Sequence, residues 1–218
     1  MELSPRQLAR LAGALYLVNI LGGFFAIGVV PSMTSDAVHS HELLYRAGLA
    51  VHVVVTATNV PLAIIFFDLF KVVNRRVALL VVLFTLVGTS IEAAGIVNEF
   101  AALSTQATYV DLSVDNYDVS TVFFGFYAIA MGYVVFRSTF MPRAIGVLMA
   151  IDGLAYVVNA FAFMLSPDFA MHLVPYIQLP ALFGEGSLCL WLLIAGVNAR
   201  RWNERNAMRP AMAAASAS

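Results

Sequence analysis

The chain has 218 residues, of which 61% are hydrophobic and 11% are charged, and its mean hydropathy is +0.86. Soluble domains are usually about 45–50% apolar and about 25% charged, so this composition excludes soluble, disordered and collagen-like proteins. The formal net charge of −1 gives no sign of nucleic-acid binding. Because Cys189 is the only cysteine, an intrachain disulfide framework and a CxxC motif are excluded. The chain is therefore predicted to be a polytopic membrane protein.

Six segments of the chain satisfy the requirement of about 20 mostly apolar residues for a bilayer-spanning helix. They are residues 11–30, 47–70, 77–103, 119–136, 144–165 and 176–198. The first is too long for a cleaved signal peptide and no A-x-A-like site closes it, so we expect a retained signal-anchor helix. The predicted fold is an all-α bundle of six transmembrane helices in a single domain, residues 1–198. A basic and then disordered tail, residues 199–218, is expected to follow it.

Short basic connections alternate with longer acidic connections between the predicted helices. All Lys and Arg residues except Arg46 fall on one side of the bundle. The positive-inside rule places this side and both termini in the cytoplasm, and therefore the protein in the inner (cytoplasmic) cell membrane. An even number of helices agrees with two cytoplasmic termini. The basic residues interpreted as topology anchors include Arg75, Arg76, Arg137, Arg143, Arg200 and Arg201.

Polar residues recur inside the predicted spans, where an ionisable group is costly and is by default a functional hypothesis. The candidate ligand- or ion-binding residues are Glu92, Glu185, Asp152, Glu99, His52, Asn59, Asn19, Asn159 and Tyr156. Glu92 and Glu99 are seven residues apart and therefore share one helix face, as do Asp152, Tyr156 and Asn159. Lipid cannot satisfy such polar stripes, so they are expected to face the interior of the bundle.

These stripes are compatible with three kinds of protein. The first has a central polar cavity that binds or moves a small molecule, lipid or ion. The second is an intramembrane enzyme acting on a lipid or quinone, with His52 as the acid/base and Glu99 as its orienting partner. In the third, a structural or interaction protein, protonated carboxyls and amides only specify helix packing, and small-residue faces serve internal packing or a homodimer.

No motif in the sequence predicts a cofactor, a metal ion or a nucleophilic catalytic triad. Haem ligation would need paired histidines at matched depth, and only His52 lies within a predicted span. A zinc site would need about three converging ligands, and the histidine spacing matches no such motif. A non-enzymatic role is therefore favoured over an enzymatic one, with the lipid bilayer as the expected partner and no nucleic acid.

Three segments carry a resemblance to a known family: FKVVNRRVALL, FFGFYAIAMGYVVFRSTFMPRAIGVL and FGEGSLCLWLLIAGVN. They resemble the bacterial six-helix membrane family catalogued as domain of unknown function 4386 (DUF4386), over about residues 11–198. The most specific matches are Gly132, Tyr133, Arg137, Pro142, Arg143, Gly146 and Glu185. Asp152 stands where the family pattern is apolar or small. The resemblance implies a six-helix membrane fold and no established activity.

Overall fold

The computed structural model describes residues 3–29, 41–103 and 108–215, without the side chains of 27–29, 102, 108–116 and 209–215. Its helices are α1 (Pro5–Val29), α3 (Glu42–Phe70), α4 (Arg75–Ala102), α5 (Thr108–Arg137), α6 (Arg143–Leu165), α7 (Pro167–Leu173), the 3-10 turn η1 (Tyr176–Gln178), α8 (Leu179–Ile194) and α9 (Ala199–Ala215). Within the described ranges there is no strand, and six helices are long and apolar enough to cross a membrane. The predicted all-α, six-helix fold is confirmed.

Several helix boundaries differ from the prediction. Helices α1 and α3 begin earlier than expected, at Pro5 instead of residue 11 and at Glu42 instead of residue 47. Helix α5 begins at Thr108 instead of residue 119, because no Pro or Gly interrupts its polar first turns. Helix α8 ends at Ile194 instead of residue 198, because Gly196 adopts a positive φ of 68°. Helix α9 continues to Ala215, where disorder was expected from residue 211, and its alanine-rich end has high helix propensity. Residues 30 and 216–218 of the predicted segments lie outside the described residues.

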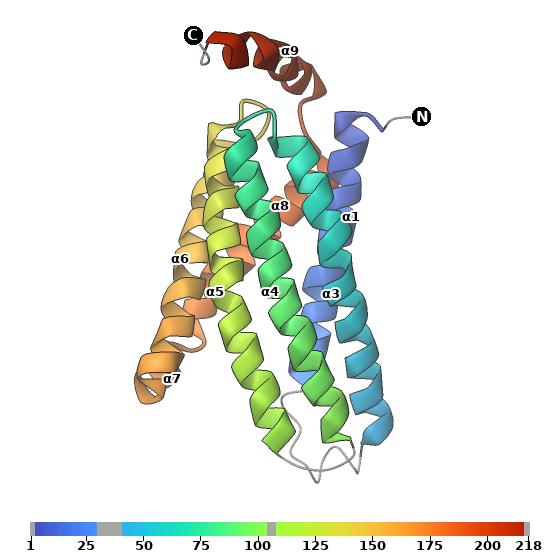
Figure 1. The fold of residues 1–218 in the computed structure, drawn as a ribbon, viewed down its shortest axis with the longest axis vertical. Coiled ribbons are helices and arrows are strands. Elements are labelled where there is room, and N and C mark those ends of the chain that lie inside the picture. The colour runs from blue at the N-terminus through green and yellow to red at the C-terminus, as the bar shows by residue number, and fades with distance from the viewer. Residues whose placement is uncertain (1–2, 30–40, 104–107, 216–218) are drawn as a thin grey trace.

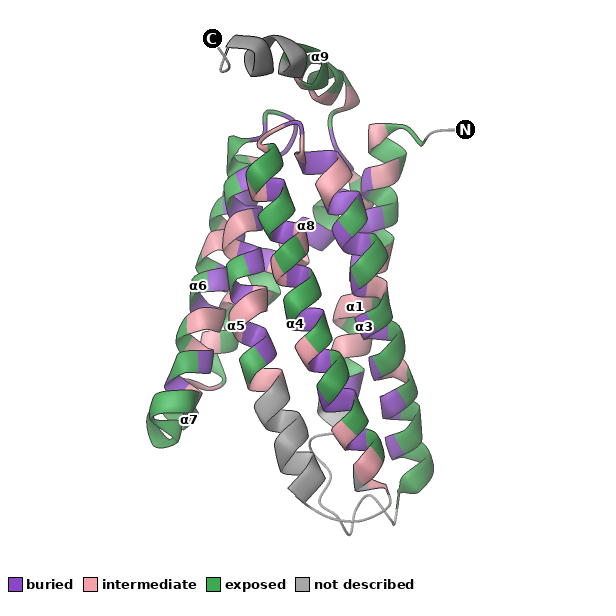
Figure 2. Ribbon diagram, in the orientation of Figure 1, coloured by how far each residue is buried: buried purple, intermediate pink, exposed green. Residues whose placement is uncertain are grey.

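The six long helices form a closed ring (Figure 1). Helix α1 packs on α3, and the contacts continue from α3 through α4, α5 and α6 to α8, which packs back on α1. Exposed residues run along the outside of these helices (Figure 2) and include many large apolar side chains, as a lipid-facing surface requires. One face of every helix is thereby turned towards a shared interior.

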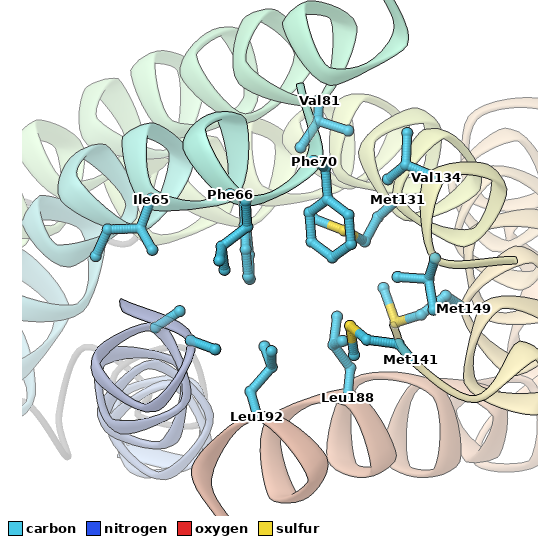
Figure 3. Close-up of a cluster of buried hydrophobic side chains, with 14 of the residues drawn as sticks. Ile65, Phe66, Phe70, Val81, Met131, Val134, Met141, Met149, Leu188 and Leu192 are labelled. Atoms are coloured by element: carbon cyan, nitrogen blue, oxygen red, sulfur yellow. The ribbon is translucent and has the colours of Figure 1, made fainter. Parts of the chain in front are cut away.

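An apolar cluster fills the interior at one end of the ring (Figure 3). Phe66 and Phe70 of α3, Met131 of α5, Met149 of α6 and Leu188 of α8 point towards one another across the ring and are fully buried. The Phe66 and Phe70 ring centroids are 6.3 Å apart. This end is also the end at which the α3–α4 and α5–α6 connections, α9 and both chain termini lie (Figure 1).

Helix α9 lies across this same end, which carries most of the basic residues and is called the basic end below. The last carbonyls of a helix have no partner within the helix, and α9 supplies donors to two of them and to one carbonyl of the α5–α6 connection. Trp202 Nε1 donates to the Leu69 carbonyl at 2.8 Å, and Arg205 and Arg201 donate to the carbonyls of Arg137 and Thr139, each at 3.0 Å. The tail therefore ties α9 to α3 and to the end of α5.

The remaining predicted anchors also lie at the basic end. Arg75 and Arg76 are exposed at the start of α4, which Asn74 caps by accepting the backbone N–H groups of Arg76 and Val77. Arg143 begins α6 and lies over the Phe136 ring, 5.8 Å from its centroid. The positions of these three arginines agree with their predicted role in stabilising the helix ends.

Glycines allow α5 and α6 to approach each other with their backbones in contact. A Cβ atom added at Gly132 would lie 2.7 Å from the Gly146 carbonyl oxygen and 2.8 Å from the Ala150 nitrogen. Close packing of this kind is a principal source of helix association in a bilayer. The close contact of the two backbones excludes a larger residue from both positions.

We expect Gly132→Ala to lower the free energy of unfolding by about 1–3 kcal/mol, because the added methyl group overpacks a backbone contact. The matched control is Gly23→Ala, since a Cβ atom at Gly23 meets nothing within 4 Å. That change gains up to about 1 kcal/mol of helix propensity and should be neutral or stabilising. Thermal unfolding in detergent checks both, and equal midpoints for the two variants would contradict the close α5–α6 packing.

Candidate functional site

His52 of α3 lies between two carboxylates of α4. Its Nδ1 atom is 3.0 Å from Glu99 Oε2 and its Nε2 atom is 3.3 Å from Glu92 Oε1. The three residues, called the histidine cluster below, are 7%, 3% and 9% exposed for His52, Glu99 and Glu92. The spacing of Glu92 and Glu99 places both on one face of α4, and the imidazole bridges them.

The protonation of the histidine cluster follows from its hydrogen bonds. A ring nitrogen and a carboxylate oxygen form a hydrogen bond only if one of them holds a proton, so the two contacts need two protons. With two protons, the imidazole and the two carboxylates still carry one net negative charge. Among the described residues, Arg46 is the basic residue of this end of the ring, and it is exposed and paired with Glu42. The cluster therefore favours a further proton or another cation.

The surroundings of the histidine cluster add unused hydrogen-bonding capacity. The Tyr45 hydroxyl donates to the backbone carbonyl of Glu99 at 3.0 Å. Thr56 and Thr89 are buried on the same helix faces, and their hydroxyls have no hydrogen-bond partner. The Glu92 Oε2 atom is also without a partner. Buried polar atoms are normally paired, so each of these three atoms has capacity for a further hydrogen bond.

Asn19 and Asn59, two of the predicted ligand candidates, bond to each other. The Asn19 Nδ2 atom donates to Asn59 Oδ1 at 2.8 Å and lies 3.1 Å from the Val55 carbonyl and 3.0 Å from Thr58 Oγ1. These contacts join α1 to α3. The role of this pair is helix packing, because amide side chains commonly hydrogen-bond between transmembrane helices.

A second polar group surrounds Asp152 of α6. Asp152 is fully buried and neither carboxylate oxygen has a hydrogen-bond partner. Helix α8 packs directly on it, because a Cβ atom added at Gly184 would lie 2.8 Å from Asp152 Cβ. The neighbouring Glu185 interacts electrostatically with Asp152, and the hydroxyls of Tyr16 and Tyr156 lie close to the Glu185 carboxylate. These four residues are called the aspartate cluster below.

The aspartate cluster lies near the middle of the ring. Asp152 follows Arg143 by nine residues, and Glu185 precedes Ile194 by nine. At a rise of 1.5 Å per residue, both lie about 14 Å from the basic end. The hydrocarbon core of a bilayer is about 30 Å thick, so this depth is close to its midplane. The histidine cluster lies further from the basic end, since Glu92 follows Arg76 by sixteen residues.

The structure thus divides the predicted candidates between two clusters and one packing contact. Asn159, on the same face of α6 as Asp152, has a buried Oδ1 atom without a partner. Tyr117 of α5 lies within electrostatic range of both Glu92 and Glu185. Sequence reasoning missed Tyr117 because it assigned this residue to a connection. The absence of Pro and Gly from residues 108–118 was the signal that α5 extends further.

Transition-metal binding finds no support in the described part of the chain, where no group of three His, Cys, Asp or Glu side chains could hold a metal ion. The geometry of the histidine cluster gives the reason. Its two carboxylates face opposite nitrogens of the ring and cannot converge on one ion together with the imidazole.

A closed ring of six apolar helices around buried polar groups defines a polytopic integral membrane protein. The chain belongs to the family described as Domain of unknown function (DUF4386), which it matches over residues 11–196. A relative from Archaeoglobus fulgidus, described as "Uncharacterized protein", is 26% identical over 142 residues, or 63% of this chain and 76% of the relative. No solved structure gives a significant match. The family resemblance of the sequence is confirmed.

We expect strong energetic coupling between His52 and Glu99 in a double-mutant cycle of His52→Ala and Glu99→Ala. Removing one partner of a buried charged pair costs about 3–5 kcal/mol, because the other is left unpaired. The control cycle uses Glu42 and Arg46, an exposed pair on one helix face that should couple by only about 0.3–0.5 kcal/mol. Equilibrium unfolding in detergent provides the free energies. A coupling no larger than that of the control would show that the buried contact is not formed.

Proposed function

We propose that this protein is an ion-coupled membrane carrier that moves a small ion or molecule and binds protons at the histidine cluster. The observation that carries the proposal is a buried imidazole with a carboxylate on each ring nitrogen. Such a ring accepts a proton on one nitrogen and releases one from the other, and histidine titrates near neutral pH. Chains of histidine and carboxylate side chains inside a membrane are typical of proton relays.

Two further features support this proposal. The histidine cluster keeps a negative charge when both of its contacts are made, and Glu92 Oε2 remains without a partner. Tyr117 lies within electrostatic range of both Glu92 and Glu185.

Proton movement is measured with the protein reconstituted into liposomes that contain a pH-sensitive dye. A pH gradient with a clamped membrane potential should give protein-dependent proton flux. His52→Gln and Glu92→Gln should reduce the flux to that of protein-free liposomes, because each removes a proton-binding group. Glu42→Gln is the matched control, as an exposed carboxylate at the same end of the ring. Flux unchanged by the two cluster variants would refute a proton-binding role for this site.

An intramembrane enzyme acting on a lipid or quinone is the second candidate. The contact between His52 Nδ1 and Glu99 supports it, because a carboxylate on one nitrogen orients an imidazole for acid/base work on the other. Against it, Glu92 occupies the second nitrogen, and a substrate would have to displace that buried carboxylate. Substrate turnover that is lost in His52→Ala but retained in Glu92→Gln would favour the enzyme over the carrier.

We also propose that the basic end faces the cytoplasm of a bacterial inner membrane. The support is that both termini and the basic helix connections lie at one end of the ring (Figure 1), which the positive-inside rule assigns to the cytoplasm.

A carboxy-terminal fusion to green fluorescent protein should therefore fluoresce in bacterial cells, and a fusion to alkaline phosphatase should be inactive. The control is the same pair of reporters after Phe70, which should behave identically because the α3–α4 connection lies at the same end. Active phosphatase at the carboxy terminus would reverse the proposed orientation.

A further inference from the structure

We propose that the aspartate cluster is a binding site for a monovalent alkali cation, Na⁺ or K⁺. This site is separate from the histidine cluster: its residues come from α1, α6 and α8, whereas the histidine cluster is built on α3 and α4. The proposal does not depend on proton movement through His52.

The first argument is the supply of oxygen atoms. Both Asp152 carboxylate oxygens are buried without a hydrogen-bond partner, in a residue that is 0% exposed, and the Glu185 carboxylate lies within electrostatic range of them. Carboxylate, carbonyl and hydroxyl oxygens are the ligands that hard cations prefer. A buried carboxylate with two free oxygens is an expensive arrangement unless something binds to it.

The second argument is charge. Asp152 and Glu185 are close enough to interact, and tyrosine hydroxyls surround them. Among the described residues, neither Asp152 nor Glu185 forms an ion pair. Arg10 and Arg143 belong to the same helices, but their contacts lie at the basic end. Two adjacent carboxylates near the midplane of a bilayer cannot both be ionised without a counter-charge. A bound cation supplies that charge, and in its absence the pair must hold a proton.

The third argument concerns the valence of the ion. The cost of moving an ion out of water grows with the square of its charge, so a desolvated site favours a monovalent over a divalent ion. Mg²⁺ in particular keeps several of its waters. The site has little space for them, because fully buried Asp152 packs directly against the α8 backbone at Gly184. Glu185 is only half-buried, and we therefore place the entry of the ion on the side of Glu185.

Cation binding is tested by the thermal unfolding midpoint of the purified protein at constant ionic strength. NaCl, KCl and choline chloride are compared at one pH, with choline as the cation too large for the site. At about 100-fold excess over the Kd, Na⁺ or K⁺ should raise the midpoint by roughly 5–10 °C relative to choline. Asp152→Asn should lose this shift. Asp68→Asn should retain it, because Asp68 is a partly exposed aspartate that pairs with Lys71.

A folding defect in Asp152→Asn would also abolish the shift, so the wild-type protein provides a second measurement. A cation that enters the carboxylate pair displaces the proton held there, and a weakly buffered sample should become more acidic after addition of NaCl or KCl but not of choline chloride. The proposal is overturned by the absence of both the shift and the proton release. A shift produced only by Mg²⁺ or Ca²⁺, or one retained in a folded Asp152→Asn protein, also overturns it.

The variant His52→Gln separates this site from the proposed proton site. It should lose proton flux while keeping the cation-dependent midpoint shift. Loss of the cation shift in His52→Gln would overturn the assignment of the cation to the aspartate cluster, whatever the result for proton flux.

Discussion

The structure depends on one constraint: within a bilayer, a polar group has no water to bind and must find its partner inside the protein. The closed ring of six helices satisfies this constraint, because each helix turns its polar stripe inwards and its apolar side chains outwards. Asn19 and Asn59 meet it completely by bonding to each other. His52 meets it with two carboxylates, and Asp152 does not meet it at all. The extent to which each polar residue is paired within the protein thus separates residues that hold helices together from those available to a ligand.

Much of the fold was predictable from hydropathy, because the length of an apolar segment is fixed by the thickness of the bilayer. Hydropathy does not define where a helix ends, however. Helix α5 extends to Thr108 through polar residues, and α9 forms from a basic segment with no apolar stretch. The contacts of Trp202, Arg201 and Arg205 with backbone carbonyls of α3, the α5–α6 connection and α5 are long-range, and no local pattern in the sequence encodes them.

The members of the site were easier to predict than their partners. Intramembrane carboxylates and amides are conspicuous in the sequence, and their spacing gives the face of each helix that carries them. The pairing of polar faces between neighbouring helices depends on how the two helices are rotated and at what depth they pack. The sequence therefore led to a single polar cavity, whereas the structure places Glu92 beside His52 and Glu185 beside Asp152. Tyr117, which lies within electrostatic range of Glu92 and Glu185, belongs to a helix because α5 is longer than its apolar segment.

The order of the clusters along the ring constrains how an ion-coupled carrier of this shape would work. From the basic end, the apolar cluster around Phe66 and Phe70 comes first, then the aspartate cluster, and then the histidine cluster. An ion at Asp152 is therefore separated from the basic end by packed apolar side chains in this conformation. Its release there requires helices to move apart, and the backbone contact at Gly132 and Gly146 makes α5 and α6 poor candidates for separation. A movement of this pair as one unit against α1 and α3 would open the apolar cluster while preserving the glycine contact.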